Sequence, residues 1–175
     1  MDSSEFYNFL ITRASVREYR PGEIGHELED FILDCASTAP SAGNREAWDV
    51  VVVSSGEQKL AIAEAAYQQA HVGEAALLFV VCANYVRSMS RYGERGILYA
   101  LQDATIASTY MMLAAHSLGL VSCWVGAFEE DEIRKELSLP EHVRPAAILC
   151  VGTGSQPSSF TERMDIGEHV HREHW

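Results

Sequence analysis

Positive charge is scarce in this chain of 175 residues. Lys and Arg together number 13 against 25 Asp and Glu, so the formal net charge is -12 at pH 7. Two of the 13 are lysines, Lys59 and Lys135. Binding to a phosphate backbone requires a basic protein face, so this balance argues against a nucleic-acid partner. The same balance argues against binding to an anionic membrane surface.

Long apolar runs and closely spaced cysteines are missing as well. The longest apolar runs, such as residues 75–83, are far too short to cross a bilayer. The acidic, polar start at residues 1–5 gives no expectation of a signal peptide. The four cysteines lie in apolar contexts without CxxC spacing, which predicts reduced core thiols in a cytoplasmic protein; they are Cys35, Cys82, Cys123 and Cys150.

Several motifs of catalysis and nucleotide binding are absent. The sequence contains no P-loop, no Gly-x-Ser-x-Gly elbow and no His-Glu-x-x-His motif, and no acid pair indicates a glycosidase. Gly152-Thr-Gly154 begins like a dinucleotide-binding glycine loop. Ser155, Gln156 and Pro157 follow where the third glycine and a helix are required, which excludes a Rossmann site.

The apolar pattern predicts one domain over residues 1–175, with a polar C-terminal arm at 155–175. Strands that are apolar on both faces and separated by helices predict a sheet with helices on both sides, in an α/β or α+β layered fold. A long helix apolar on most faces is predicted to be buried in the core or against another subunit. The predicted helices are 4–12, 26–38, 57–69, 98–118 and 130–137, and the strands are 48–53, 76–83, 121–125 and 146–151.

Arg13-Ala-Ser-Val-Arg17 brings together two of the few cations. At alternating spacing, Arg13, Ser15 and Arg17 lie on one side of an extended segment. Two guanidinium forks and a hydroxyl suit a phosphate, which accepts several charge-assisted hydrogen bonds. The alternative is a solvated surface patch.

Two other segments have the composition of a ligand site. The loop 38–44 carries small residues, with Ser41 and Asn44 able to hydrogen-bond the edge of a heteroaromatic ring. In residues 119–128 a strand ends in Gly-Ala, where backbone N–H groups can bind a ligand and Trp124 can cover an aromatic ring. The alternatives are an ordinary helix-to-strand connection and a buried strand with a core Trp.

The tail contains a cluster of possible metal ligands: His169, His171, His174, Glu168 and Glu173. A metal site is conceivable for this composition. A solvated arm is the favoured interpretation, so no metal is predicted. Arg163 precedes these residues and is a cation available to complete an anion site.

In this order, the segments resemble the nitroreductase family of FMN-dependent oxidoreductases, over nearly the whole chain. Arg13-Ala-Ser-Val-Arg17 matches the family's Arg-x-Ser-x-Arg. Pro40-Ser-Ala-Gly-Asn44, followed by Trp48, matches its Pro-Ser-x-x-Asn loop. Residues 98–128 resemble the family's central helix and following strand, and Arg163 before an arm ending in Trp175 matches its C-terminal pattern.

The resemblance implies a fold and an activity. The fold is an α+β, three-layer α/β/α sandwich with a central, mostly antiparallel sheet. It forms a homodimer with a long central helix and FMN at the interface. NAD(P)H would pass hydride to flavin N5, and a nitroaromatic, a quinone or a similar small acceptor would reoxidise the flavin. FMN carries the chemistry, so no catalytic side chain is expected.

The resemblance also implies the cofactor-binding residues. The phosphate and ribityl chain would be held by Arg13, Ala14, Ser15, Arg17 and Arg163. The partner subunit's flavin would be reached by Pro40, Ser41, Ala42 and Asn44. The isoalloxazine would be lined by Trp124, Val125, Gly126 and Ala127, with a backbone N–H near N5. A glutamine at 68 or 69 is expected to face the flavin.

Departures from the family pattern leave other functions open. Glu46-Ala47 stands where the family usually has Gln-Pro, and Gly126 stands where many larger members have a glutamate. The stretch between the strand ending near 83 and the helix from 98 is short, which predicts an open pocket. The alternatives are a dehalogenase, an azoline dehydrogenase or a flavin-fragmenting enzyme of the same fold, or a non-enzymatic flavin-binding module.

Overall fold

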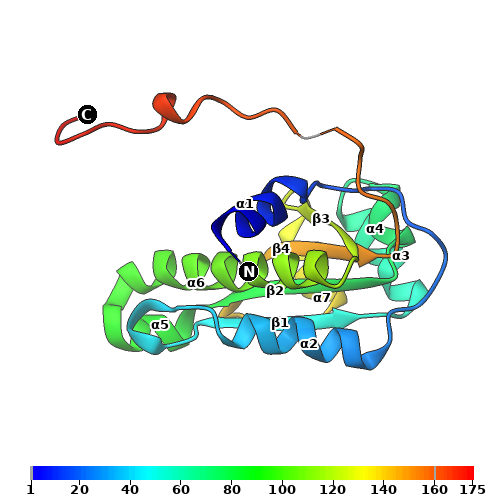
Figure 1. Cartoon of the computed structure of the whole chain (residues 1–175). Coiled ribbons are helices and arrows are strands. Elements are labelled where there is room, and N and C mark those ends of the chain that lie inside the picture. Colours follow the sequence, from blue (N-terminus) through cyan, green and yellow to red (C-terminus); the bar gives the residue numbers. More distant parts are fainter. Residues whose placement is uncertain (1, 160) are drawn as a thin grey trace.

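The chain folds into three layers with a sheet in the middle (Figure 1). The computed structural model describes residues 2–159 and 161–175. All three neighbouring strand pairs are antiparallel, in the order β1-β2-β4-β3. The strands are β1 (Trp48–Val53), β2 (Leu77–Asn84), β3 (Val121–Val125) and β4 (Val143–Gly152). The expected α+β sandwich is thereby confirmed.

Alternation along β2 divides the core into two halves. Phe79 and Val81 pack beneath α2 (His26–Ser37) and α6 (Gly96–Ser117). Leu78 and Val80 point to the opposite face, beneath α3 (Gly56–Ala65) and α7 (Glu130–Glu136). Successive strand residues face opposite sides of a sheet, so a strand that is apolar throughout must be covered on both sides. β2, whose eight residues are all buried, is such a strand.

The predicted helix 57–69 is in fact two helices. α3 ends at Ala65, and α4 (Ala70–Glu74) begins after a turn. Tyr67 and Gln68 both have a φ of 58° in this turn, and the Gln68 N–H donates to the Ala63 carbonyl over 2.9 Å. Left-handed backbone costs energy in residues other than glycine and often occurs at functional sites. The turn contains no glycine or proline that would predict it.

A short helix, α5 (Tyr85–Tyr92), lies between β2 and α6 where no helix was predicted. The Asn84 side chain caps it by accepting from the Arg87 N–H over 3.3 Å. Gly96 then allows α6 to begin directly against α5, because a Cβ at this position would lie 2.6 Å from the Met89 N atom. The close packing holds α5 beside the loop that precedes β1.

The two edges of the sheet differ. β1 is only partly buried over most of its length, in contrast to the buried strand predicted there. At the other edge, the Val16 N–H donates to Ser122 in β3 over 2.9 Å. The Arg20 N–H donates to Thr153 over 2.8 Å. The N-terminal segment therefore runs along the ends of β3 and β4.

The glycines after β4 make room for this segment. A Cβ at Gly152 would lie 2.6 Å from the Tyr19 ring, and one at Gly154 would lie 2.7 Å from a Val121 methyl group. Gly152-Thr-Gly154 is thus a packing feature.

Beyond Gly154 the chain leaves the body of the molecule as an arm (Figure 1). The described residues 161–175 are all exposed, including the apolar Met164, Ile166 and Trp175. A search of residues 2–159 and 161–175 finds no helix of sufficient length and hydropathy to cross a membrane.

Candidate functional site

The segment from Arg13 to Arg17 alternates as predicted. Ala14 and Val16 are buried, whereas Ser15 and Arg17 are exposed and Arg13 is partly exposed. The buried residues anchor the segment, and the three polar side chains remain available to a ligand. These polar side chains divide between two neighbouring hollows instead of lining a single one.

The first hollow, of about 330 Å³, contains two arginines. It lies between α1 (Ser3–Thr12) and the start of the arm, and both Arg13 and Arg163 line it. Burial lowers the pKa of Arg13, and the nearby charge of Arg163 lowers it further. Within the described part of the chain, neither guanidinium has a carboxylate within 4.0 Å. An anion in this hollow would relieve their repulsion.

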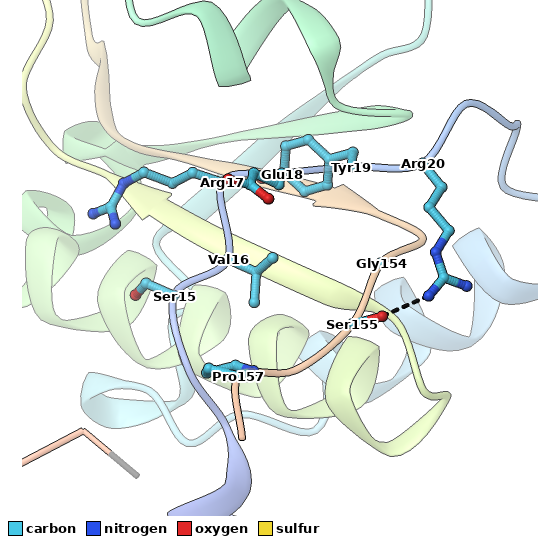
Figure 2. Close-up of a pocket in the computed structure, with 9 residues that line it drawn as sticks. All are labelled: Ser15, Val16, Arg17, Glu18, Tyr19, Arg20, Gly154, Ser155 and Pro157. Atoms are coloured by element: carbon cyan, nitrogen blue, oxygen red, sulfur yellow. Dashed lines mark hydrogen bonds between the residues drawn. The ribbon is translucent and has the colours of Figure 1, made fainter. Parts of the chain in front are cut away.

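The second hollow, of about 500 Å³, lies against the N-terminal segment and contains Ser15 and Arg17 (Figure 2). Gly154, Ser155 and Pro157 form its other side. At its far end, one Nη atom of Arg20 donates to Ser155 Oγ over 2.5 Å, which links the two sides of the hollow. Arg17 extends away from Arg20 and has no such partner among the residues drawn in Figure 2.

His116 of α6 links α1 to the start of the arm. Its Nε2 lies 3.1 Å from the Phe9 carbonyl in α1, and its Nδ1 lies 3.3 Å from Gln156 Nε2 at the start of the arm. A carbonyl can only accept, so Nε2 carries the hydrogen and Nδ1 accepts from the Gln156 amide. In this amide orientation the neutral imidazole satisfies both contacts, and its Nε2 also lies 3.1 Å from Thr12 Oγ1.

The fold is expected to lose stability as the pH falls below about 6.5, the ordinary His value. Burial lowers the pKa of both His71 and His116, with smaller contributions from Arg17 and Arg13 respectively. The unfolded chain therefore takes up protons first, and the stability present above 6.5 is lost as the pH falls through the folded-state values. Measuring Tm from pH 8 to pH 5 tests this, with His116→Gln expected to flatten the curve.

An exposed histidine provides the control for this pH dependence. His169 lies in the arm, and His169→Gln should leave the pH dependence of Tm at its wild-type slope. If His116→Gln and His169→Gln gave the same slope as the wild type, the proposed role of His116 would be wrong.

The loop around Pro40 is fixed by a buried carboxylate. Asp103 of α6, 2% exposed, accepts from the Ala42 N–H over 2.9 Å and from the Ala47 N–H over 3.1 Å. Ser41 Oγ accepts from the Glu46 N–H over 3.0 Å. The two bonds to Asp103 hold the loop against α6.

A hollow of about 510 Å³ lies between this loop and α6. Pro40, Ser41 and Ala42 line it, and Asn44 does not. Asn44 is exposed, with a φ of 55°. Three of the four predicted loop residues therefore face one cavity.

The end of β3 presents Gly126 and Ala127 to solvent, above buried Val125 and partly buried Trp124. Gln69 lies beside them, since its Nε2 donates to the Ala127 carbonyl over 3.1 Å. Of the two glutamines considered in the sequence, Gln69 is therefore the one that contacts this strand end.

Within one chain these segments do not form a single cavity. The Pro40 loop is bonded to Asp103, whereas Arg13 Nη1 lies 4.0 Å from Met112 Sδ, further along α6. At 1.5 Å per residue, the two helix positions are separated by about 14 Å along the helix axis. The Pro40 loop and the arginine segment are therefore separate groups on the surface of one chain.

Two buried polar atoms near Arg17 lack partners within the described residues: Tyr19 Oη and His71 Nε2. His71 is only 8% exposed, and its pKa is lowered by burial, as noted above. Neither side chain was predicted to belong to the site. The positions of Tyr19 and His71 depend on how α4 packs against the N-terminal segment, and no local sequence motif indicates that packing.

The described residues contain no group of three His, Cys, Asp or Glu side chains placed to hold a metal ion. The tail histidines lie in the exposed arm. Cys123 and Cys150 face each other across β3 and β4, and burial raises the pKa of both thiols. Thiols with raised pKa values are poor nucleophiles at neutral pH.

Comparison with known proteins identifies related sequences. The model of the nitroreductase family matches residues 10–79 and 65–153. A protein of Methanothermobacter thermautotrophicus named "Putative NADH dehydrogenase/NAD(P)H nitroreductase" is 33% identical over 94% of this chain and 84% of its own length. The Bacillus subtilis "FMN reductase (NADPH)" is 27% identical over 89% of this chain and 68% of its own length.

Solved structures agree with the sequence comparison. The structure of NfrA2 from B. megaterium superposes with a TM-score of 0.91 at 28% identity. The match covers 100% of this chain and 76% of the other.

Proposed function

Because this chain belongs to the nitroreductase family, we propose that it is an FMN-dependent oxidoreductase that takes hydride from NAD(P)H. The electrons would pass to a nitroaromatic, a quinone or a similar small acceptor. The names of similar proteins, an FMN reductase and an NAD(P)H nitroreductase among them, support this activity. The observation that carries the proposal is the pair of unneutralised arginines, Arg13 and Arg163, facing one hollow in an acidic protein.

The phosphate end of FMN fits these arginines. A phosphate carries close to two negative charges and accepts hydrogen bonds in several directions. Arg13 and Arg163 would hold it from two sides, and Ser15 and Arg17 in the adjoining hollow would bind the ribityl chain or the remaining phosphate oxygens. Ala14 contributes through its backbone, since its side chain is buried.

The isoalloxazine end of FMN fits the end of β3 at Gly126 and Ala127. No Cβ protrudes at Gly126, so a flat ring can approach the backbone closely. Gln69 and Trp124 lie beside this surface and would limit how the ring sits. Bound FMN would supply the redox chemistry, because its N5 accepts hydride from a dihydronicotinamide and its reduced form gives two electrons to an acceptor. A backbone N–H at 126 or 127 would orient the N5 edge and donate to it.

We further propose that two chains complete each site. The Pro40 loop and the arginines face different cavities in one chain, so one copy cannot surround a whole flavin. The outer face of α6 exposes Ile97 and Leu98, and the arm exposes further apolar side chains. Burying both surfaces in a homodimer would bring the Pro40 loop of one copy towards the arginines of the other.

The absorption spectrum of the purified protein tests the proposal. We expect the yellow flavin bands after incubation with FMN and removal of the excess. Anaerobic addition of NADH or NADPH should bleach these bands at a rate that saturates with nucleotide concentration. A protein that stays colourless after incubation with FMN would refute the cofactor assignment.

The alternative functions suggested by the sequence predict different results in this spectroscopic test. Bound FMN that no pyridine nucleotide reduces would favour a specialised flavoprotein of this fold or a flavin-binding module. Reduction by NAD(P)H with turnover of a nitroaromatic or quinone would support the oxidoreductase.

A further inference from the structure

A cluster of four arginines surrounds α5, far along α6 from Arg13. Arg87 and Arg91 are four residues apart on α5, and Arg95 follows in the short 3-10 helix Gly93–Arg95. Arg45 joins them from the loop before β1. All four are exposed. We call Arg45, Arg91 and Arg95, with Tyr92 and Tyr99, the α5 patch.

Hydrogen bonds hold Arg45 over α5. Its Nε donates to the Arg87 carbonyl over 3.1 Å, and an Nη donates to Ser90 Oγ over 3.0 Å. Arg87 forms an ion pair with Asp49, with N and O 2.6 Å apart, and is therefore not counted as available to a ligand. The remaining Nη of Arg45 is left to solvent, so its fork is positioned in advance.

Aromatic contacts position the other two arginines. The Arg91 guanidinium lies 5.5 Å from the centre of the Tyr92 ring, and that of Arg95 lies 5.5 Å from the centre of the Tyr99 ring. Arg95 Nε also donates to Tyr99 Oη over 2.6 Å. The two rings meet edge to face with centroids 4.9 Å apart. A guanidinium over a ring keeps its charge while losing mobility.

The charge of the patch is not neutralised by the protein. None of the carboxylates in residues 2–159 and 161–175 lies within 4.0 Å of Arg45, Arg91 or Arg95, although Glu46 and Glu94 are neighbours in the sequence. In a chain of net charge -12, three adjacent unpaired arginines are unexpected unless an anion binds them.

The patch adjoins the hollow by the Pro40 loop. Arg91 Nη1 donates to the Gly43 carbonyl over 3.4 Å, and a Cβ at Gly43 would lie 2.2 Å from Tyr92 Oη. Tyr99 lines the hollow together with Pro40 and Ser41. Arg91 and Arg95 are therefore linked to this partly apolar cavity through Gly43 and Tyr99, and Arg45 lies beside them over α5. An amphiphilic ligand could place a ring in the cavity and its anionic groups over these arginines.

We propose that the α5 patch binds the phosphate groups of the incoming pyridine nucleotide. The proposal rests on the proposed function, in which the Pro40 loop borders the flavin of a second copy. With the nicotinamide over that flavin, the diphosphate extends outwards to the rim. Phosphate binding by guanidinium forks, with Tyr92 and Tyr99 beside them, suits a dinucleotide tail.

The test uses the FMN-loaded protein and three hydride donors. NADH and NADPH carry the diphosphate, and NADPH alone carries a 2′-phosphate. The third donor, 1-benzyl-1,4-dihydronicotinamide, carries no phosphate. In Arg91→Ala and in Arg95→Ala, each of which removes one arginine–phosphate contact, we expect KM for a phosphate-bearing donor to rise about tenfold. Flavin reduction by the benzyl compound should be unchanged. Arg95→Lys should recover part of the loss.

Matched controls separate this proposal from the proposed function. Lys135→Ala removes one positive charge from an exposed site on α7 and should leave every KM unchanged. A KM rise for NADPH alone would place the 2′-phosphate at the patch, and a rise for both nucleotides would place the diphosphate there. Unchanged KM values in both arginine variants, or equal losses with the benzyl compound, would overturn the patch assignment alone. Failure of all three donors to reduce the wild-type flavin would overturn the proposed function and this proposal together.

Discussion

Arg13→Ala is expected to weaken FMN binding by roughly 10- to 150-fold, which corresponds to about 1.5–3 kcal/mol for a charge-assisted pair. Arg13 lies in a hollow with a second arginine, and burial together with that neighbour lowers its pKa. A phosphate there gains two cations without displacing a protein carboxylate. Titrating flavin-free protein with FMN and following the loss of flavin fluorescence gives the dissociation constant.

Riboflavin provides the sharpest control for this prediction, because it has the same ring system without the phosphate. Its affinity should be nearly the same for the wild type and for Arg13→Ala. Lys135→Ala should leave both affinities unchanged, since that side chain is exposed and pairs with Glu132 on α7. An equal loss of FMN and riboflavin binding would mean that Arg13 supports the fold of the hollow and does not contact phosphate.

Asp103→Ala is expected to destabilise the fold by about 3 kcal/mol. The carboxylate accepts two backbone N–H groups, and the substitution leaves the donor at Ala47, which is fully buried, without a partner. A hydrogen bond to a charged group contributes about 1.5–3 kcal/mol, and two bonds from one side chain do not add fully. For a chain of this size the loss lowers Tm by roughly 6–12 °C. Thermal unfolding at one fixed protein concentration measures it.

Asp103→Asn distinguishes the charge of the side chain from its shape. The amide retains one acceptor oxygen of the same size, so an intermediate loss is expected, and the amide NH₂ would oppose one backbone donor. Asp131→Ala, an exposed change in the first turn of α7, provides the comparison. If Asp103→Ala lowered Tm no more than Asp131→Ala, the buried carboxylate would not be what holds the Pro40 loop.

Most of the sheet could be predicted from the sequence. Trp48–Val53 and Val121–Val125 were predicted with the boundaries that the structure has, because each is mainly apolar, with Asp49 and Ser122 as its single polar residues, and is followed by polar or small residues. The alternation of Ala14 and Val16 with polar neighbours also predicted which side chains point outwards. In these segments the local pattern and the tertiary packing agree.

The features that were not predicted depend on contacts between distant residues. Most of the residues of α5 are polar or only weakly apolar, and the helix is held by Asn84 and by packing against Gly96. The turn at Tyr67 and Gln68 has positive φ angles, and the sequence there contains no glycine that would predict them. The division of the arginine segment between two hollows depends on the arm, which returns to Arg13 from 150 positions later in the chain (163 - 13).

The long-range pairing of the N-terminal segment also determines when the site can assemble during protein synthesis. The Val16 N–H donates to Ser122 and the Arg20 N–H to Thr153, so the ribosome must release the chain beyond Thr153 before the segment has all its neighbours. Until then Arg13 and Arg17 belong to a stretch of the nascent chain that lacks these backbone partners. Contacts between such distant residues close late in folding. A cofactor held by these arginines would therefore bind only after β4 has been synthesised, and its supply could not assist the earlier folding of β1 and β2.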